Sequence, residues 1–462
     1  MTDEVMNQRN IVTVGKLKTA IAVLAFMTMA GCAETTREEA TGEGRIRGVN
    51  GIVDAPEVQF LIEEIILDNI GFKIASGFET YDDLSYNFNF DLFVPGEPDT
   101  RRIASRFIDV VADTDYTLIL TGTMANPSII VWEDEPREFD GSETVFENTF
   151  AHLAPTLGQV DVYFAPSGTP PAPGGAVATL SLGERTDFIE YPQAEYELVV
   201  TAPSDPGTVI FQSGPLNFPT ATRQIVGLFD PDPSITAPLG VAAISPSGLT
   251  SNIADVNFPP QLRFVHASNA NAAVNVDGYV DMDFNNPVFS NVAYRGVSAY
   301  FNVDVGQPVV TATQAGNPGG TIVENPVVIT SNSKRTLLLG GDQGSEFFRS
   351  LPDDARPLAS FPVVRFVNMA VNSALFNIYI QEPGFEITEE TVPSFIGLSP
   401  QFDTGFFGPP EGTFEITITA IDDIVPLAPV FTIDFANRDV VDIVILDTDD
   451  PNVFEIFEFD RF

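Results

Sequence analysis

The chain has 462 residues, 44% of them hydrophobic, which is enough for about three to four domains with buried cores. The formal net charge of −42, with only 22 Lys and Arg residues, disfavours nucleic acid and anionic headgroups as partners, because a polyanion repels phosphate groups. The single cysteine excludes an internal disulfide framework.

Residues 1–31 have the features of a signal peptide and are not expected to belong to the fold. A basic start is followed by an apolar run, Thr19 to Ala30, whose dozen or so residues are too few to span a bilayer comfortably. The run ends in Met29-Ala30-Gly31-Cys32.

These four residues resemble the bacterial lipoprotein box, with Met where Leu is usual. In such a box the thiol takes a diacylglyceryl group. We therefore expect Cys32 to be the lipidated N-terminus of a protein on the bacterial cell envelope, with the outer membrane as the expected location. The alternative is an ordinary signal peptide followed by an incidental cysteine.

The segment after the cysteine, 32–45, contains no apolar residue larger than Ala. It cannot bury enough surface to order itself, and we expect a flexible tether there.

A repeated skeleton organises the rest of the chain. An Asn or His, here called the anchor, is followed eight residues later by an apolar–polar–apolar triplet. Anchors and triplets are Asn50 with Val58-Gln59-Phe60, His152 with Val160-Asp161-Val162, His266 with Val274-Asn275-Val276, and Asn368 with Phe376-Asn377-Ile378. Successive anchors are 102, 114 and 102 residues apart by subtraction of their numbers, which suits one small domain per repeat. We expect the anchors to begin equivalent first strands.

Alternating apolar and polar residues predict strands with one buried face, for example at Val160 to Phe164 and Phe414 to Thr419. Leu61 to Gly71 is the nearest helix candidate and fits a strand–turn reading equally well. The predicted fold class is all-β, with four tandem Ig-like antiparallel β-sandwiches. Their predicted extents are 46–140, 146–232, 260–345 and 360–462. Linkers are expected at Glu133–Glu143, Pro231–Pro260 and Gly340–Arg356.

The third repeat resembles the bacterial domain-of-unknown-function family 4397, which occurs in secreted and lipid-anchored surface proteins. The similarity rests on Arg263-Phe264-Val265-His266-Ala267-Ser268, Val274-Asn275-Val276-Asp277-Gly278, Ser290-Asn291-Val292-Ala293-Tyr294, Ser298-Ala299-Tyr300 and Val303-Asp304-Val305-Gly306. The second repeat keeps several of these features, and the first and fourth are more divergent. The resemblance implies an Ig-like sandwich and a surface location, and it carries no known activity or catalytic residue.

His152 and His266 are the only histidines, and no nucleophile, zinc-ligand or phosphate-loop motif accompanies them. As catalytic bases they would need such a partner. Because Asn occupies the same place in two repeats, we interpret all four anchors as structural side chains that hydrogen-bond the following turn. No catalytic residue, metal site or cofactor is predicted.

Two other groups of side chains are candidates for binding. Acidic loops could place several oxygens around calcium, although solvated turns of an acidic protein would look the same. Tyr81, Phe188 and Tyr300 occupy related places in their repeats and are interpreted as core residues rather than a glycan platform. The acidic loops are Asp277, Asp281, Asp283 and Asn285, and Asp447, Asp449, Asp450 and Asn452.

The sequence thus predicts a lipid-anchored envelope protein with a structural, adhesive or binding role and no catalysis. Its expected partners are the membrane, through the lipid, and a protein or glycan at the cell surface. The alternatives are a calcium-stiffened adhesin arm and an envelope hydrolase that uses a pair of carboxylates.

Overall fold

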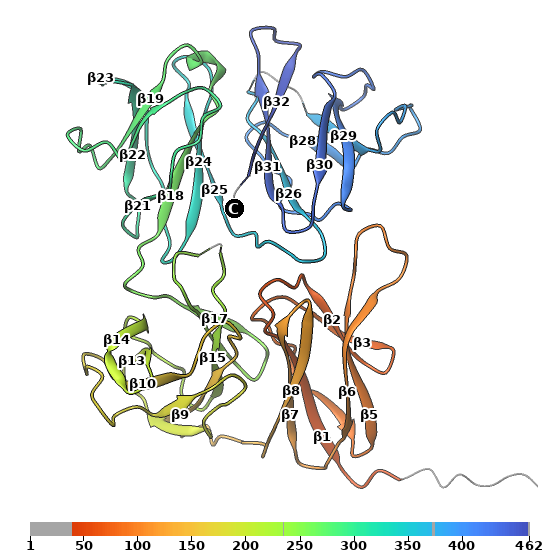
Figure 1. Ribbon diagram of the computed structural model, residues 1–462, viewed down its shortest axis with the longest axis vertical. Coiled ribbons are helices and arrows are strands. Elements are labelled where there is room, and N and C mark those ends of the chain that lie inside the picture. The colour runs from red at the N-terminus through yellow and green to blue at the C-terminus, as the bar shows by residue number, and fades with distance from the viewer. Residues whose placement is uncertain (1–38, 234, 372–374, 461–462) are drawn as a thin grey trace, which may run out of the picture. The chain divides into compact units, whose positions relative to one another are not determined.

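The structure, a computed structural model, describes residues 39–233, 235–371 and 375–460 (Figure 1). Gly42–Phe462 forms one compact unit, with which the following description is concerned. Apart from one turn of 3-10 helix at Asn269–Asn271, every regular element of the described residues is a β-strand, which confirms the all-β prediction. No helix in this part of the chain is long and apolar enough to cross a membrane. Cys32 and the predicted signal peptide lie outside the described residues.

Each repeat folds into two sheets, and the strands enter the two sheets in the same order in the first three repeats and, apart from a fourth strand that is missing among the described residues, in the fourth. We name the sheet that contains the first strand the anchor sheet and the other sheet the distal sheet. The anchor sheet takes the first, fourth, seventh and eighth strands, and the distal sheet takes the second, third, fifth and sixth. The predicted repeated sandwich is therefore confirmed.

The first two sandwiches differ by one added strand. In the first, the anchor sheet has the order β4-β1-β7-β8 and the distal sheet β3-β2-β5-β6; in the second, the orders are β12-β9-β15-β16-β17 and β11-β10-β13-β14. The strands of the first are β1 (Glu43–Asn50), β2 (Val58–Ile62), β3 (Ile65–Ile70), β4 (Glu79–Asp82), β5 (Ser85–Leu92), β6 (Arg101–Asp109), β7 (Asp115–Thr123) and β8 (Asn126–Asp134). Those of the second are β9 (Val145–His152), β10 (Val160–Pro166), β11 (Ala178–Leu180), β12 (Ile189–Pro192), β13 (Tyr196–Ala202), β14 (Asp205–Gln212), β15 (Arg223–Phe229), β16 (Gly240–Ile244) and β17 (Thr250–Ile253).

The third and fourth sandwiches repeat this plan. The third has the orders β21-β18-β24-β25 and β20-β19-β22-β23, and the fourth β26-β31-β32 and β28-β27-β29-β30. In the fourth, isolated bridges from Val364 to Phe407 and from Val367 to Asp403 stand where the fourth strand lies elsewhere. The strands are β18 (Gln261–His266), β19 (Val276–Val280), β20 (Phe289–Val292), β21 (Phe301–Asn302), β22 (Val309–Gln314), β23 (Asn317–Pro326), β24 (Lys334–Gly340), β25 (Phe347–Pro352), β26 (Val363–Asn368), β27 (Phe376–Gln381), β28 (Phe395–Leu398), β29 (Gly412–Ala420), β30 (Phe431–Phe435), β31 (Val440–Asp447) and β32 (Phe454–Asp460).

The space between the two sheets of each sandwich is filled by the apolar side chains of the alternating strands. In the first sandwich Phe60 of β2 is fully buried, and its ring centroid lies 5.1 Å from that of Phe90 on the neighbouring β5. Aromatic pairs at such separations add about 0.5–1.5 kcal/mol to the stabilisation that comes from burying their area. The strand–turn reading of Leu61 to Gly71 is correct, because β2 ends at Ile62 and β3 begins at Ile65.

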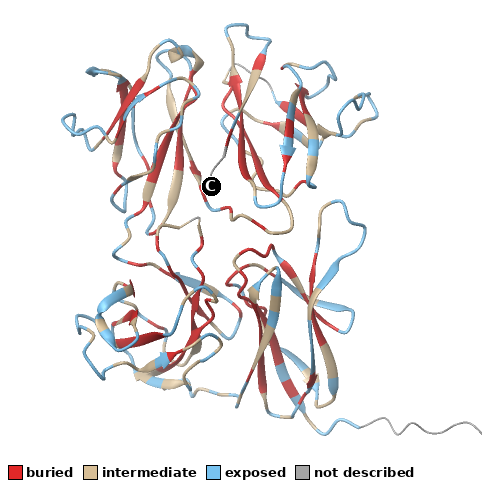
Figure 2. Ribbon diagram, in the orientation of Figure 1, coloured by how far each residue is buried: buried red, intermediate tan, exposed pale blue. Residues whose placement is uncertain are grey.

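The anchor sheets are covered on both faces, because they also pack against each other in pairs. Val49 and Ile119 of the first sandwich share one apolar cluster with Ala151 and Phe229 of the second. Val265, Leu338, Val367 and Val444 form the corresponding cluster between the third and fourth. The first and seventh strands of the anchor sheets are accordingly buried along most of their length (Figure 2). This explains why β31 and its equivalents read as continuous apolar runs rather than as alternating ones.

Three predicted boundaries need correction. The expected linker Pro231–Pro260 contains β16 and β17, which extend the second anchor sheet, and Gly340–Arg356 contains β25, which completes the third. These edge hairpins cover the flank of the apolar seventh strand. The predicted tether also ends too late, because Glu43–Arg45 begins β1, where Arg45 makes two hydrogen bonds, at 2.7 and 2.6 Å, to the carboxylate of Asp115.

The anchors lie at the ends of the first strands and not, as predicted, at their beginnings.

The third triplet lies two residues later than predicted, because the 3-10 turn at Asn269–Asn271 lengthens the loop after His266. Val274 is only half-buried and precedes β19. Strand pairing shows that Asp277, and not Asn275, is the middle residue of the third triplet. Asp277 faces Thr313, just as Asp161 faces Thr201 and Asn377 faces Thr419 in their own repeats.

The pairing of anchor sheets predicts the effect of truncating Leu338, which is fully buried between the third and fourth sandwiches. Leu338→Ala should lower the free energy of unfolding by about 2–5 kcal/mol, because it leaves a cavity at a doubly covered strand. Thermal and denaturant unfolding of the full chain measure this loss. Leu249→Ala is the control, since Leu249 is 75% exposed and its truncation should leave the transition unchanged. Equal effects of the two substitutions would contradict the interface.

Candidate functional site

The four anchors are fully buried, and each hydrogen-bonds backbone groups of the turn that follows the first strand or of the end of the third strand. Asn50 donates through Nδ2 to the carbonyls of Pro56 and Ile70, both at 3.2 Å, and accepts from the N–H of Ile52 at 3.1 Å. Asn368 repeats the pattern, donating to Leu398 and accepting from Ala370. A buried turn needs such partners, because an unpaired buried backbone group costs about 1–3 kcal/mol.

His152 makes the equivalent contacts with its ring. Its Nδ1 accepts from the N–H of Ala154 at 3.4 Å, two residues on, and its Nε2 lies 2.9 Å from the carbonyl of Gly158, six residues on. This arrangement requires the proton on Nε2. His266 departs from the pattern: its Nε2 lies 3.2 Å from the carbonyl of Val274, whereas its Nδ1 makes no hydrogen bond within the described part of the chain. Burial lowers the pKa of His266.

A second repeated motif was recognised in the sequence only in part, through Phe188 and Tyr300. The motif is a Ser or Thr followed two residues later by Phe or Tyr. The hydroxyl oxygen of the Ser or Thr accepts a hydrogen bond from the backbone N–H of the residue two positions before the anchor, with N···O distances of 2.8–3.1 Å. The motifs are Ser76-Gly77-Phe78 on Gly48, Thr186-Asp187-Phe188 on Phe150, Ser298-Ala299-Tyr300 on Phe264, and Thr404-Gly405-Phe406 on Phe366. The related aromatic of the first repeat is therefore Phe78; Tyr81, which was predicted, lies in β4 and packs against Tyr86 and Phe88.

A guanidinium lies over each of these four aromatic rings. The distances from the guanidinium carbon to the ring centroid are 4.4 Å for Arg47 and Phe78, 4.1 Å for Arg223 and Phe188, 5.1 Å for Arg263 and Tyr300, and 4.5 Å for Arg365 and Phe406. Cation–π contacts of this kind contribute about 0.5–2 kcal/mol each. Arg47, Arg263 and Arg365 each stand three residues before an anchor. A charged residue at one fixed offset in apolar strands is the signal that could have revealed them.

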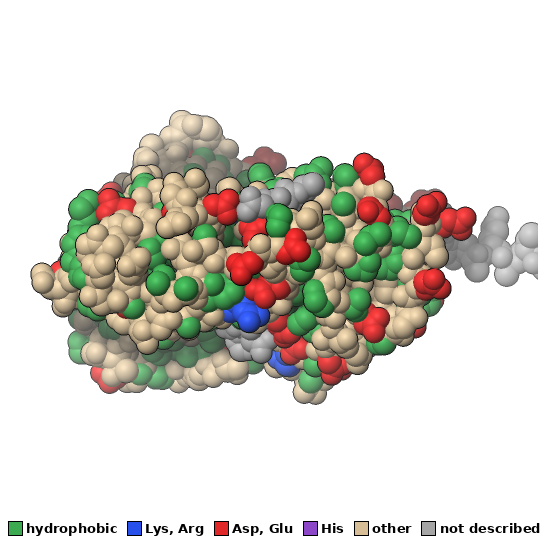
Figure 3. All heavy atoms as spheres, turned by 90° about the horizontal axis from the view of Figure 1, so that it is seen from above, with side chains coloured by type: hydrophobic (Ala, Val, Ile, Leu, Met, Phe, Trp, Pro, Cys, Tyr) green, Lys and Arg blue, Asp and Glu red, His purple; other side chains and the backbone are tan. Residues whose placement is uncertain are grey.

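Between the first two sandwiches these residues enclose a cavity of about 260 Å³, which we name the arginine–phenylalanine pocket. The lining includes Arg45, Arg47, Arg137, Arg223, Phe78, Phe139, Phe188, Asp115, Asp134, Thr117 and Pro246. The chain as a whole is strongly acidic, and on the face shown in Figure 3 acidic side chains are spread widely while basic ones are few. Four of the chain's 22 Lys and Arg residues thus line this one cavity.

Most cations of the arginine–phenylalanine pocket are neutralised by carboxylates. Arg45 binds Asp115, which raises the pKa of Arg45. Arg137 and Arg223 both bind Glu147, at 3.0 and 2.8 Å. These arginines are therefore held in place by charges of the chain itself.

Arg47 is different. Its side chain is almost completely buried, and its hydrogen bonds go to the hydroxyl of Thr117, at 3.1 Å, and to the carbonyl of Ser245, at 2.9 Å. None of its hydrogen bonds within the described chain reaches a carboxylate, and burial lowers the pKa of Arg47 to about 10. Asp134, which lies nearby, is bound instead by two nitrogens of Arg185, at 2.9 and 2.7 Å.

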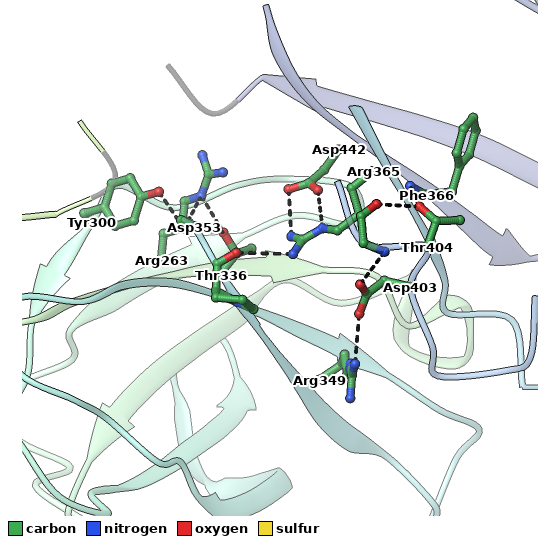
Figure 4. A network of polar contacts seen from close by, with 12 residues as sticks. Arg263, Tyr300, Thr336, Arg349, Asp353, Arg365, Phe366, Asp403, Thr404 and Asp442 are labelled. Atoms are coloured by element: carbon green, nitrogen blue, oxygen red, sulfur yellow. Dashed lines mark hydrogen bonds and ion pairs between the residues drawn. The ribbon is translucent and has the colours of Figure 1, made fainter. Parts of the chain in front are cut away.

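The corresponding region between the third and fourth sandwiches is a closed polar network (Figure 4). Arg365 binds Asp442 with two hydrogen bonds, at 2.8 and 3.3 Å, and both side chains are buried. The carboxylate of Asp353, also buried, accepts from Thr336 and from the hydroxyl of Tyr300 and lies 3.8 Å from Arg263. In this interface, buried aspartates of the protein itself therefore balance the charges of Arg263 and Arg365.

A larger cavity, of about 700 Å³, is lined by residues of the first three sandwiches, including Lys73, Lys334, Arg335 and Arg356. Its cations are held by the chain as well. Arg356 donates to the carbonyls of Val53 and Ala55, Lys334 donates to that of Pro233, and the Lys73 ammonium lies 3.9 Å from a carboxylate oxygen of Asp232. The lining also contains the carboxylates of Asp232, Asp353 and Asp354, so this cavity is less suited to an anionic ligand.

The acidic loops do not assemble into a metal site: among the described residues no group of three or more His, Cys, Asp or Glu side chains could hold a metal ion. Their oxygens bind turn backbone instead. Asp277 accepts from the N–H groups of Asn291 and Gly316, Asp281 from Val309, and Asp447 from Val371. The calcium-stiffened arm therefore gains no support from these loops.

Comparison with known proteins identifies the family. The model of the family described as Domain of unknown function (DUF4397) matches residues 44–163 and 260–379, slightly more than half of the chain. This chain belongs to the DUF4397 family. The second match starts at 260 against 44 for the first, and His266 follows Asn50 by the same 216 residues. Each match covers nearly one whole sandwich and ends within the second strand of the next.

Other similarities are weak. The solved structure of the Bacillus anthracis TIE protein is 12% identical over 89% of this chain and 69% of that chain, with a TM-score of 0.15. A carbohydrate-binding module of family CBM26 from Eubacterium rectale Amy13K, solved with maltoheptaose, is 13% identical over 40% of this chain and 91% of that chain, with a TM-score of 0.13. Scores this low carry no argument about function. No curated protein matches the chain.

The anchor geometry predicts that His152→Asn is tolerated, because Asn50 makes the same two types of contact, to residues two and six positions on. The expected cost is about 1 kcal/mol, the difference between two hydrogen-bonding side chains. His152→Leu should cost more, since the Ala154 N–H and the Gly158 carbonyl lose their partner. Unfolding of the full chain ranks the three proteins, and equal losses for Asn and Leu would contradict the structural role.

The Arg365–Asp442 pair predicts a pH dependence. Burial outweighs the neighbouring guanidinium and raises the pKa of Asp442 to about 7. The unfolded chain releases this proton near pH 4, so between about pH 4 and 7 the folded state binds more protons, and the stability contributed by the group falls as pH rises. The melting temperature of the wild type minus that of Asp442→Asn should therefore decrease across this range. A difference that increases with pH would contradict the shift.

Proposed function

We propose that this protein is a lipid-anchored, non-catalytic binding module of the bacterial cell envelope, held at the outer membrane through Cys32. The observation that carries the proposal is the use of the anchors. Both histidines are fully buried, and their Nε2 atoms contact backbone carbonyls, so the side chains best suited to general base catalysis are engaged in the fold.

The acidic composition supports a position clear of the membrane surface. With a net charge of −42, the folded part is repelled by anionic headgroups, so attachment would depend on the lipid rather than on the protein surface. One acyl chain gives marginal binding, whereas the several chains of a processed lipoprotein anchor stably. The segment between Cys32 and β1 would then serve as the spacer.

The hydrolase alternative requires carboxylates that are free to act on a substrate. In the arginine–phenylalanine pocket the two lining carboxylates are instead bound by guanidinium groups, Asp115 by Arg45 and Asp134 by Arg185. A pair of carboxylates held in this way favours binding over proton transfer.

The lipid anchor is tested by Cys32→Ser in a Gram-negative host. The wild type should fractionate with membranes, and its mature N-terminus should be Cys32 carrying the mass of a diacylglyceryl group. Cys32→Ser should be released or retain its signal peptide, whereas Thr35→Ala, three residues on, should behave like the wild type. Recovery of unlipidated wild-type protein that begins at another residue would contradict the proposal.

A further inference from the structure

We propose that the arginine–phenylalanine pocket between the first two sandwiches binds a carboxylate-bearing ligand about the size of one sugar ring, with Arg47 as the residue that receives the carboxylate. The proposal refines the binding role given above. It does not depend on the lipid anchor.

The first argument is the state of Arg47. Its guanidinium is buried yet hydrogen-bonded only to Thr117 and to the carbonyl of Ser245, and it lines an open cavity. A buried guanidinium that no carboxylate contacts directly is costly, even with Asp115 and Asp134 nearby, and a carboxylate is the group whose two oxygens match the planar fork of an arginine. A ligand that brings such a group would relieve this cost.

The second argument is the internal duplication. Thr117 is the strand partner of Arg47, and Asp442 is the strand partner of Arg365 at the equivalent place in the fourth sandwich. There the chain supplies the carboxylate itself, in a two-bond contact with Arg365. The fourth sandwich thus accommodates a carboxylate at this position, whereas the first and third place the hydroxyls of Thr117 and Thr336 there. In the third sandwich the carboxylate of Asp353 lies 3.8 Å from the arginine, whereas in the first no carboxylate of the described chain is hydrogen-bonded to Arg47.

The third argument is the lining. Phe78 and Phe188 lie beneath Arg47 and Arg223, and Phe139 lies beneath Arg137, so apolar faces and cations alternate around the cavity. The volume of about 260 Å³ is at the small end for ligand sites, which suits one ring rather than a chain. Arg45, Arg137 and Arg223 are already paired with Asp115 and Glu147, so Arg47 is the lining arginine whose hydrogen bonds reach no carboxylate of the described chain.

The test uses the full chain in detergent, with sodium glucuronate as the probe and glucose as the uncharged counterpart. Binding is followed by calorimetry and by chemical-shift changes of labelled Arg side chains. Glucuronate should bind the wild type, and glucose should bind at least tenfold more weakly. A wild type that binds neither sugar at tens of millimolar would overturn the proposal.

Two substitutions of equal size separate the charge from the shape. Thr117→Asp places a carboxylate beside Arg47, as Asp442 stands beside Arg365, and should reduce glucuronate affinity at least tenfold while the protein remains folded. Thr117→Asn leaves Arg47 without a carboxylate and should keep the affinity within about threefold of the wild type, a difference of under 1 kcal/mol. Unchanged binding by Thr117→Asp would overturn the proposal.

A further variant covers the case in which Thr117→Asp fails to fold. Arg47→Lys keeps the charge but removes the two-pronged geometry, and it should lower the affinity for glucuronate more than that for inorganic sulfate. Tighter binding of sulfate than of glucuronate by the wild type would contradict a carboxylate site. Because all variants keep Cys32, a failure here leaves the lipid anchor untouched, and the reverse also holds.

Discussion

The structure depends on one constraint: the first strand of each sandwich is buried on both faces and must turn at its end without leaving polar groups unpaired. The anchor side chain meets this requirement. Asn50 and His152 use different atoms, yet each accepts an N–H two residues on and contacts a carbonyl six residues on. The Ser or Thr of the second motif satisfies a further N–H of the same strand. The repeated residues of the chain are therefore chiefly those that complete the hydrogen bonding of a doubly buried strand.

Double burial also explains where the charges lie. An arginine three residues before an anchor is covered by the partner sandwich, so its charge must be met inside the interface. The third and fourth sandwiches meet it with Asp353 and Asp442. The first two meet it incompletely, because Arg185 binds Asp134 and the strand partner of Arg47 is the uncharged Thr117. One pair of sandwiches thus has a closed interface and the other has an open pocket.

The sequence predicted the all-β sandwiches and the places of the anchors, because alternation and a fixed period report directly on strands and repeats. Boundaries were less accurate: β16, β17 and β25 lie in Pro- and Gly-containing segments whose composition is typical of linkers. The third triplet was misplaced by two residues, since a loop insertion such as Asn269–Asn271 leaves no mark in a hydrophobic pattern.

The pocket could not be predicted from the sequence. Within the described residues, Arg47 lacks a hydrogen-bonded carboxylate because Arg45 binds Asp115 and Arg185 binds Asp134. These ion-pair partners are determined only when strands distant in sequence come together, as the strand of Arg47 does with Ser245. The recurring arginine before the anchor was the available signal, and by itself it does not separate a closed ion pair from an open site.

The central claim is that the anchor sheets are buried against each other in pairs. Amide hydrogen exchange of the full chain tests it most directly, because protection reports local opening. We expect β9 and β18, which are covered on both faces, to exchange far more slowly than the edge strands β6, β14 and β23 of the distal sheets. Exchange of the first strands as fast as that of these edge strands would show that the anchor sheets are not packed together.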